Sequence, residues 1–448
     1  MRSKTFIPFL IISIVSIGAM FFKLTDATPE SLQAINGADV AWMLVASGLV
    51  LLMTPGLSFF YGGMVSYKSV VSTMLQSFIS LGVVSVLWVV VAFSLAFGDS
   101  IGGVIGNPMT FFMFNNVNLG TNASLAPTVP LLLFAMFQLK FAIITPALIT
   151  GSFAERIKFS SYLLFICLFT LLIYAPLAHW TWHPDGFLRK LGVLDFAGGT
   201  VVHMSAGFAA LAAAIMLGHR KSRSEGASSA PANIPYIILG TGLLWFGWFG
   251  FNAGSALAAN TTAALAFATT NFASAAAMLT WVFFDWMRGR KPSALGACIG
   301  AVVGLVAITP AAGFVNIGQS IFIGFIGALT SNLVLTYFNK TSIDDTLDVF
   351  PCHGIGGAVG MLATGFFAKD VGLFYGQTTT FFYHILALVI VGAFTFCGSW
   401  VLLKLTNAIV PLRVTEDEEK MGLDATQHGE EMSSFKERLD EYRPVYIN

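Results

Sequence analysis

Charged side chains are scarce in this sequence. They make up 10% of its 448 residues, whereas hydrophobic residues make up 56%. A soluble protein of this length would carry about twice that share of charge, which excludes a soluble globular fold. The net charge is zero and gives no support to a nucleic-acid partner. Apolar runs of about 20 residues recur from end to end, and because they do not alternate they predict membrane helices, not a β-barrel.

Cysteine is scarce as well. The four cysteines are widely spaced, lie in apolar segments and form no CxxC pair: Cys167, Cys298, Cys352 and Cys397. This spacing disfavours a disulfide framework or a zinc site, and we expect no metal and no other cofactor.

The first 27 residues have the pattern of a signal peptide. Two basic residues, Arg2 and Lys4, precede an apolar stretch, and small residues follow in the "TDA" at 25–27. We therefore expect cleavage after Ala27. The apolar stretch is long for a signal peptide, so an uncleaved helix is the alternative.

Eleven further hydrophobic segments follow this leader. They lie near 39–65, 70–98, 128–153, 160–180, 197–218, 234–255, 261–287, 294–314, 316–340, 353–369 and 381–408. Alternate connections hold Lys68, Arg156, Lys158, Arg220, Lys221, Arg223, Arg288, Arg290, Lys291 and Lys340, and the opposite set holds only Arg189, Lys190 and Lys369. Because cytoplasmic loops are enriched in Lys and Arg, this bias predicts a mature N-terminus outside the cell membrane and a cytoplasmic C-terminus.

One motif occurs twice, 150 residues apart. "DFAGGTVVHMSAG" fills 195–207 and "DTLDVFPCHGIGG" fills 345–357, each with an Asp eight positions before a His. His203 lies in the fifth span and His353 in the tenth, and two five-helix units in series have opposite orientations. The repeated motif therefore predicts an inverted repeat with both histidines near the midplane of the membrane. The expected fold is an all-α polytopic membrane protein: eleven transmembrane helices as an inverted five-plus-five repeat plus a final helix.

The chain changes character at residue 411. Residues 411–448 hold ten of the 23 acidic residues, which predicts a cytoplasmic tail following a transmembrane domain at 28–410. Asp195, at the start of its span, is expected to cap a helix and to support a site without binding an ion directly.

Several stretches together resemble the ammonium transporter family (Amt/Mep/Rh). They are "TPGLSFFYGGMV" at 54–65, "FQLKFAIITPALITGSFAERIKFS" at 137–160, "DFAGGTVVH" at 195–203, "WFGWFGFNAGSA" at 245–256, "DDTLDVFPCHG" at 344–354 and the tail's "GLDATQHGE" at 422–430. The resemblance covers residues 39 to about 430 and is greatest to the microbial and plant Amt branch.

The resemblance implies a homotrimer in which each eleven-helix subunit has its own narrow hydrophobic pore, the ammonium-transporter fold. By motif match, Phe137 and Phe141 resemble the stacked phenylalanines that gate the outer pore. Trp182, Phe141 and Ser255 resemble the outer ammonium recruitment site.

The same motifs imply the deeper residues. His203 and His353 resemble the twin histidines of the pore, and Asp195 resembles the aspartate that supports the recruitment site. Gln138 and Phe251 fall beside these motifs and are expected to line the same vestibule.

Elementary chemistry agrees with such a site. Potassium and ammonium have similar size and charge, but only ammonium can release a proton and cross an apolar pore as neutral ammonia. A charge at the bilayer centre costs about 2.5 kcal/mol or more. Aromatic faces attract a cation by roughly 0.5–2 kcal/mol, and neutral imidazoles can bind ammonia and relay its proton. We expect deprotonation at the outer site, passage past the histidines and re-protonation inside.

The family resemblance also implies partners. A PII-type regulatory protein is expected at the cytoplasmic face, where the tail carries the motif at 422–430, and methylammonium is a possible second substrate. We assign no role to Lys140, which lies inside the third span, or to residues 432–448.

Three other functions remain open from the sequence. An ammonium sensor usually carries an appended signalling domain, for which a tail of about forty residues leaves no room. A membrane enzyme with a histidine–aspartate metal site would need further ligands, and the neighbours are Val, Met, Cys and Gly. A Rhesus-like facilitator of neutral ammonia differs from an electrogenic transporter by producing no current.

Overall fold

The computed structural model describes residues 2–224 and 230–432, and these residues are predominantly helical. Within this part of the chain the only strands are β1 (Ser100–Ile101) and β2 (Ile105–Gly106), which pair antiparallel. The predicted all-α class is therefore confirmed. The last sixteen residues, most of the segment 432–448 to which we assign no role, lie outside the described part.

Eleven helical segments form the bundle. Nine in the described part of the chain are long and apolar enough to cross a membrane, and α14 and η6–α16 complete the predicted set. Their bounds are α3 (Gly37–Met64); α4 (Val70–Leu87), η2 (Trp88–Ala92) and α5 (Phe93–Phe97); α6 (Leu131–Phe153); α7 (Phe159–Phe169), η4 (Thr170–Tyr174) and α8 (Ala175–Trp182); η5 (Gly199–Met204) and α10 (Ser205–Leu217); α12 (Ile234–Gly254); α13 (Thr261–Met287); α14 (Ala294–Ile308); α15 (Ile317–Phe338); η6 (Phe350–Ile355) and α16 (Gly356–Phe367); and α17 (Thr379–Ile409).

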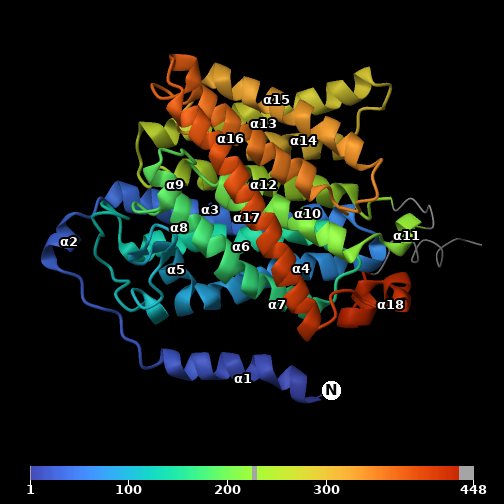
Figure 1. Ribbon diagram of the computed structural model, residues 1–448, viewed down its shortest axis with the longest axis horizontal. Helices are drawn as coiled ribbons and strands as arrows, with labels where there is room; N and C mark the ends of the chain where they lie inside the picture. The colour runs from blue at the N-terminus through green and yellow to red at the C-terminus, as the bar shows by residue number, and fades with distance from the viewer. Residues whose placement is uncertain (1, 225–229, 433–448) are drawn as a thin grey trace, which may run out of the picture.

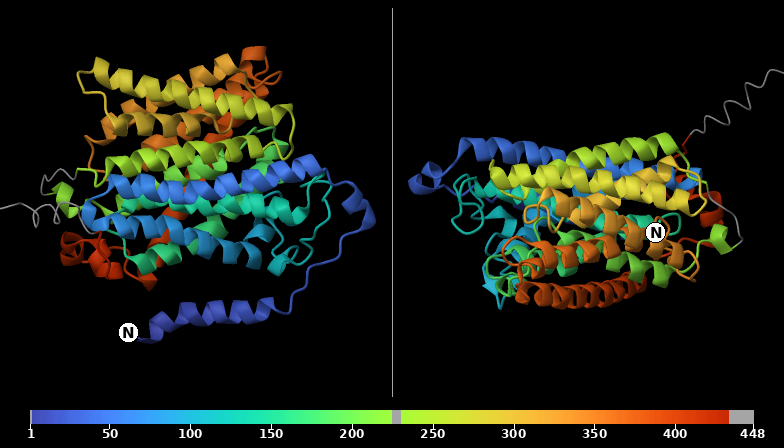
Figure 2. Two further views of the ribbon diagram at one scale, coloured as in Figure 1. Left: turned by 180° about the vertical axis from the view of Figure 1, so that it is seen from behind. Right: turned by 90° about the horizontal axis from the view of Figure 1, so that it is seen from above.

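Short helices connect and flank these spans. They are α2 (Pro29–Gln33), η1 (Tyr67–Ser69), η3 (Phe112–Phe114), α9 (Phe187–Lys190), α11 (Lys221–Ser224), η7 (Leu373–Tyr375), α18 (Glu416–Met421) and η8 (Asp424–His428). The remaining helix, α1 (Arg2–Ala19), lies apart from the bundle (Figures 1 and 2), and Phe9 and Ile14 on it are exposed. Removal of this segment as a leader stays a prediction.

The two halves of the bundle repeat each other. Helix α3 opens the first half and α12 the second; they pack against each other, and an asparagine caps each one, Asn36 and Asn233. The fifth element of each half begins with six residues of wide π-helix, η5 and η6, and each contains its histidine. Helix α17 follows the repeat and crosses obliquely over α10 and α16 (Figure 1).

Glycines let the two histidine-bearing elements cross closely. A Cβ added at Gly207 would overlap the backbone of Gly354, and one added at Gly357 would crowd the Gly199 carbonyl and the Cβ of His203. Each half therefore contributes a glycine to the contact with the other. The close crossing is what brings His203 and His353 together near the centre of the bundle.

The cationic connections and the tail meet at one end of the bundle. Arg220 pairs with Glu155 at 3.2 Å and with Asp344 at 3.0 Å, and Arg223 pairs with Asp344 at 3.1 Å. Burial alone would raise the pKa of Asp344, but its hydrogen bonds and ion pair with Arg220 lower it below the usual range. Arg413 of the tail continues the network to Glu419 at 2.7 Å.

The tail also docks through hydrogen bonds to the spans. The buried carboxylate of Asp424 accepts from the backbone N–H groups of Val71 (3.0 Å) and Ser72 (2.7 Å), at the start of α4. His428 Nε2 lies 3.1 Å from the Ser72 hydroxyl, and its ring meets Phe159 edge-on. The acidic segment is therefore packed against the bundle as far as residue 432.

Candidate functional site

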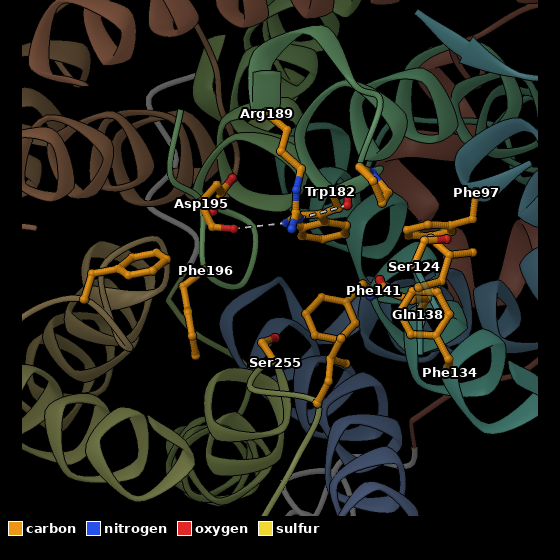
Figure 3. A pocket seen from close by; sticks show the side chains of 14 residues that line it. Phe97, Ser124, Phe134, Gln138, Phe141, Trp182, Arg189, Asp195, Phe196 and Ser255 are labelled. Carbon is orange, nitrogen blue, oxygen red and sulfur yellow. Dashed lines mark hydrogen bonds between the residues drawn. The ribbon is translucent and has the colours of Figure 1, made fainter. Parts of the chain in front are cut away.

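A cavity of about 260 Å³ opens at the end of the bundle opposite the tail. The predicted recruitment residues Phe141, Trp182 and Ser255 all line it (Figure 3). They come from α6, the end of α8 and the end of α12, so tertiary packing and not sequence proximity assembles the site. Further lining residues are Phe97, Ser124, Leu125, Phe134, Gln138, Pro184, Arg189, Asp195, Phe196, Leu257 and Phe314.

The cavity combines aromatic faces with hydrogen-bond acceptors. The rings of Phe141 and Trp182 meet edge-on, with centroids 5.7 Å apart. The Ser255 hydroxyl donates to the Phe251 carbonyl at 2.8 Å, which leaves its oxygen free to accept. Gln138 Oε1 is buried and has no hydrogen-bond partner among the described residues. This set suits a small cation that also donates hydrogen bonds.

Asp195 caps the helix that carries His203, as predicted. Its carboxylate accepts from the backbone N–H groups of Gly198 (2.8 Å), Gly199 (2.6 Å) and Thr200 (2.7 Å), and from the Thr200 hydroxyl. Its carbonyl accepts from the indole N–H of Trp182 at 3.1 Å. Both carboxylate oxygens are thus occupied by the protein itself, and the residue orients Trp182 through its backbone.

Three phenylalanine rings separate the cavity from the centre of the bundle. Phe141 and Phe251 lie nearly face to face, with centroids 4.2 Å apart and planes at 31°. Phe137 meets Phe141 edge-on at 4.9 Å and 65°, is fully buried and does not line the cavity. Phe251 also lies behind the cavity wall, not on it, so that it occupies the space between Phe141 and His203.

The two predicted histidines are in contact. His203 Nδ1 and His353 Nδ1 are 3.3 Å apart, and both residues are almost completely buried. Their side chains come from η5 and η6, the corresponding elements of the two halves. The prediction that the repeat brings the histidines together is confirmed.

Two residues beside His203 escaped the sequence analysis. Trp248 stacks on the imidazole with centroids 5.4 Å apart, and its indole N–H donates to the Thr309 hydroxyl at 2.9 Å. Thr309 in turn donates to the Leu305 carbonyl and lies 3.3 Å from His203 Nε2. Trp248 falls within the quoted stretch 245–256, three residues before Phe251, which is the signal that could have identified it.

The Thr309 hydroxyl has consequences for the histidine tautomers. It has one hydrogen, which it donates to Leu305, so it can only accept from His203. That arrangement places the proton of His203 on Nε2 and leaves Nδ1 as the acceptor for an N–H of His353. The hydrogen bond to Thr309 therefore fixes which nitrogen of each imidazole donates and which accepts within the pair.

A small space of about 10 Å³ follows His353 toward the tail end of the bundle. It is lined by Phe60, Tyr61, Met64, Ile299, Val302, Leu347, Cys352 and His353. The order from the cavity inward is thus Phe141, Phe251, His203, His353 and this inner space, which defines a narrow path through an apolar interior.

Lys140 stays outside this path. It is half-buried on α6 and does not line the cavity, and its ammonium group has no hydrogen bond or ion pair among the described residues. In the same described part of the chain, no group of three or more His, Cys, Asp or Glu is placed to hold a metal ion.

The fold and this order of residues define a polytopic membrane protein with a cavity that leads toward a buried histidine pair. Residues 41–433 match the model of the Ammonium Transporter Family. The chain therefore belongs to the ammonium transporter family, which assigns it to transport and not to enzymatic catalysis.

Individual relatives agree with this assignment. The ammonium transporter of Bacillus subtilis is 46% identical, over 88% of this chain and 97% of the relative, and the putative ammonium transporter of Methanothermobacter thermautotrophicus is 45% identical over 88% and 98%. The crystal structure of Saccharomyces cerevisiae Mep2 superposes with a TM-score of 0.84 at 33% identity, and the match covers 92% of this chain and 98% of Mep2.

Proposed function

We propose that this chain recruits ammonium in the outer cavity, removes its proton and conducts ammonia past His203 and His353. The observation that carries this proposal is the imidazole contact of 3.3 Å directly behind the Phe141–Phe251 stack. An apolar interior on both sides of the pair disfavours potassium, because an unpaired charge there costs about 2.5 kcal/mol or more.

Recruitment rests on the cavity lining. The faces of Trp182 and Phe141 attract a cation, and the oxygens of Ser255 and Gln138 accept its N–H groups. Asp195 acts through Trp182 and not on the ion, because its carboxylate is occupied by backbone N–H groups.

We assign the outer gate to Phe141 and Phe251. These two rings stack closely between the cavity and His203, whereas Phe137 packs behind Phe141. The resemblance implied a gate role for Phe137 beside Phe141; that role stays a prediction, and we favour Phe251 over Phe137 because Phe251 stacks more closely on Phe141. The released proton travels separately along the histidine pair, where each neutral ring has one acceptor and one donor nitrogen.

The wider setting is part of the same proposal. The chain acts as a homotrimer in the plasma membrane, with its mature N-terminus outside and residues 411–448 in the cytoplasm as a regulatory tail. Residues 1–27 are its leader, in keeping with the isolation of α1 from the bundle. The docked tail surface is where a PII-type protein would bind.

Paired measurements on proteoliposomes test the mechanism. Ammonium and potassium pulses are applied in turn while current and internal pH are recorded. The proposal predicts an ammonium current, no potassium current and loss of both current and selectivity in His203→Leu and His353→Leu. An internal pH change without current would establish neutral ammonia conduction instead, and a histidine variant with unchanged current and selectivity would refute the relay.

A further inference from the structure

His384 on α17 is a fully buried imidazole with both nitrogens engaged. Its Nε2 accepts the backbone N–H of Leu194 at 3.0 Å, and its Nδ1 lies 2.7 Å from the Met361 carbonyl. A backbone N–H can only donate and a carbonyl can only accept. The ring is therefore neutral with its proton on Nδ1, and both bonds fix its orientation.

The first of these bonds holds the segment that orients Trp182. Leu194 immediately precedes Asp195, whose carbonyl accepts the Trp182 indole N–H at 3.1 Å. On the other side, the Phe196 N–H donates to the Pro310 carbonyl at 3.1 Å. The carbonyl that receives the indole is thus anchored at both neighbouring residues, by His384 and by Pro310.

The second bond ties the same imidazole to the helix that follows His353. Met361 lies on α16, and its sulfur lies against Gly199 of η5. Gly365 on α16 leaves room for the ring, because a Cβ there would come within 2.9 Å of His384 Cγ. His384 therefore joins the outer loop, α16 and α17 at one point.

We propose that His384 is a positioning residue for ammonium recruitment, acting on Trp182 through Leu194 and the Asp195 carbonyl. The inference rests on the proposed function, since it assumes that Trp182 contacts the ion. A buried histidine with two hydrogen bonds could simply stabilise packing. The difference lies in its partner, because Leu194 belongs to the loop that holds the indole.

A double-mutant cycle separates these two roles. Trp182→Phe keeps an aromatic face but removes the N–H that binds the Asp195 carbonyl, so the ring at position 182 is no longer held by the loop. The initial rate of ammonium-driven internal pH change in proteoliposomes gives KM and kcat. We expect His384→Phe to raise KM roughly fivefold with kcat within about twofold of the parent, a factor of five being about 1 kcal/mol. In the Trp182→Phe background the same change should leave KM unaltered.

Two further variants serve as controls for the effect of His384→Phe. His384→Gln keeps a donor and an acceptor, so its KM is expected to stay close to that of the parent. This variant keeps the test decisive if His384→Phe does not fold. Thr395→Val changes another buried side chain of α17, whose hydroxyl has no hydrogen-bond partner among the described residues, and should leave KM unchanged.

The failure of each idea has its own signature. If the effects of His384→Phe and Trp182→Phe on KM multiply, or if His384→Gln is as impaired as His384→Phe, His384 acts only in packing and the inference is overturned. If instead Trp182→Ala leaves KM unchanged, the recruitment site itself is wrong.

Discussion

At the scale of single residues, the proposed selectivity depends on which rings close the path. Phe141 and Phe251 stack at 4.2 Å, whereas Phe137 touches Phe141 only edge-on. We expect Phe251→Leu to admit water to His203 and to lower the ratio of ammonium to potassium current by roughly tenfold or more, about 1.4 kcal/mol. Phe137→Leu is the matched control.

The readout is the current ratio from proteoliposomes. Phe137→Leu should change it little, because this ring packs behind the gate. A larger loss of selectivity in Phe137→Leu than in Phe251→Leu would return the gate to Phe137 and Phe141.

Residue types and spacings predicted the histidine pair and the Asp195 cap, but not the stacking partners. The Asp–His frame recurs in spans of corresponding rank, so an inverted repeat predicts that His203 and His353 lie near each other. Which of 42 phenylalanines stack depends on the rotation and crossing of α6 and α12. Thr309 and His384 form hydrogen bonds to segments that are distant in the sequence, and no local sequence pattern predicts such bonds.

At the scale of elements, the close crossing of the two halves limits the size of the residue at position 207. Gly207→Ala should destabilise the protein by about 1–3 kcal/mol, since its methyl group would overlap the Gly354 backbone. Gly242→Ala on α12 has open space and should be neutral or stabilise by about 1 kcal/mol or less. Thermal unfolding of the two variants in one detergent compares them, and equal melting temperatures would contradict the close crossing.

The docked tail should respond to mild acid. Burial lowers the pKa of His428, and Asp424 and Glu430 partly offset this shift. Docking therefore has its full stability above the ordinary histidine pKa of about 6.5 and weakens as pH falls below it. The effect should be about 1 kcal/mol or less, because the ring is partly solvated.

Hydrogen exchange measures this response at the amides of Val71 and Ser72, which the Asp424 carboxylate protects. After correction for intrinsic rates, protection should fall between pH 7.5 and 5.5 in the parent. His428→Gln should lose this decrease; Asp424, whose pKa is raised by burial, titrates with the opposite sign. An equal decrease in His428→Gln would show that another group controls docking.

Uninterrupted apolar runs are a strong signal, so the sequence predicts the spans well. It does not predict the wide π-helical turns within them, η2, η4, η5 and η6. A π-segment keeps nearly the same composition as an α-helix, and its extra residue per turn is favoured by contacts with other elements. By composition alone the acidic run of the tail reads as a solvated surface, and only the family motif at 422–430 pointed to the cytoplasmic face of the bundle.

At the scale of the whole molecule, charge predicts sidedness. The loop at 288–291 and the loops of the cationic network with the tail are connections on the same side of the bundle, whereas Lys190 lies at the cavity end. We expect a membrane-impermeant thiol reagent added to intact cells to label Lys190→Cys and to spare Lys291→Cys. The reverse pattern would invert the topology and place the recruitment cavity in the cytoplasm.

The glycine crossing also limits how the two halves can diverge during evolution. Where a large residue faces a small one, a gain in volume on one side can be offset by a loss on the other. Gly207 faces Gly354, and neither position can become smaller. A gain in volume at Gly207 therefore cannot be offset by a smaller side chain at Gly354, so the two halves of the gene constrain each other at this point.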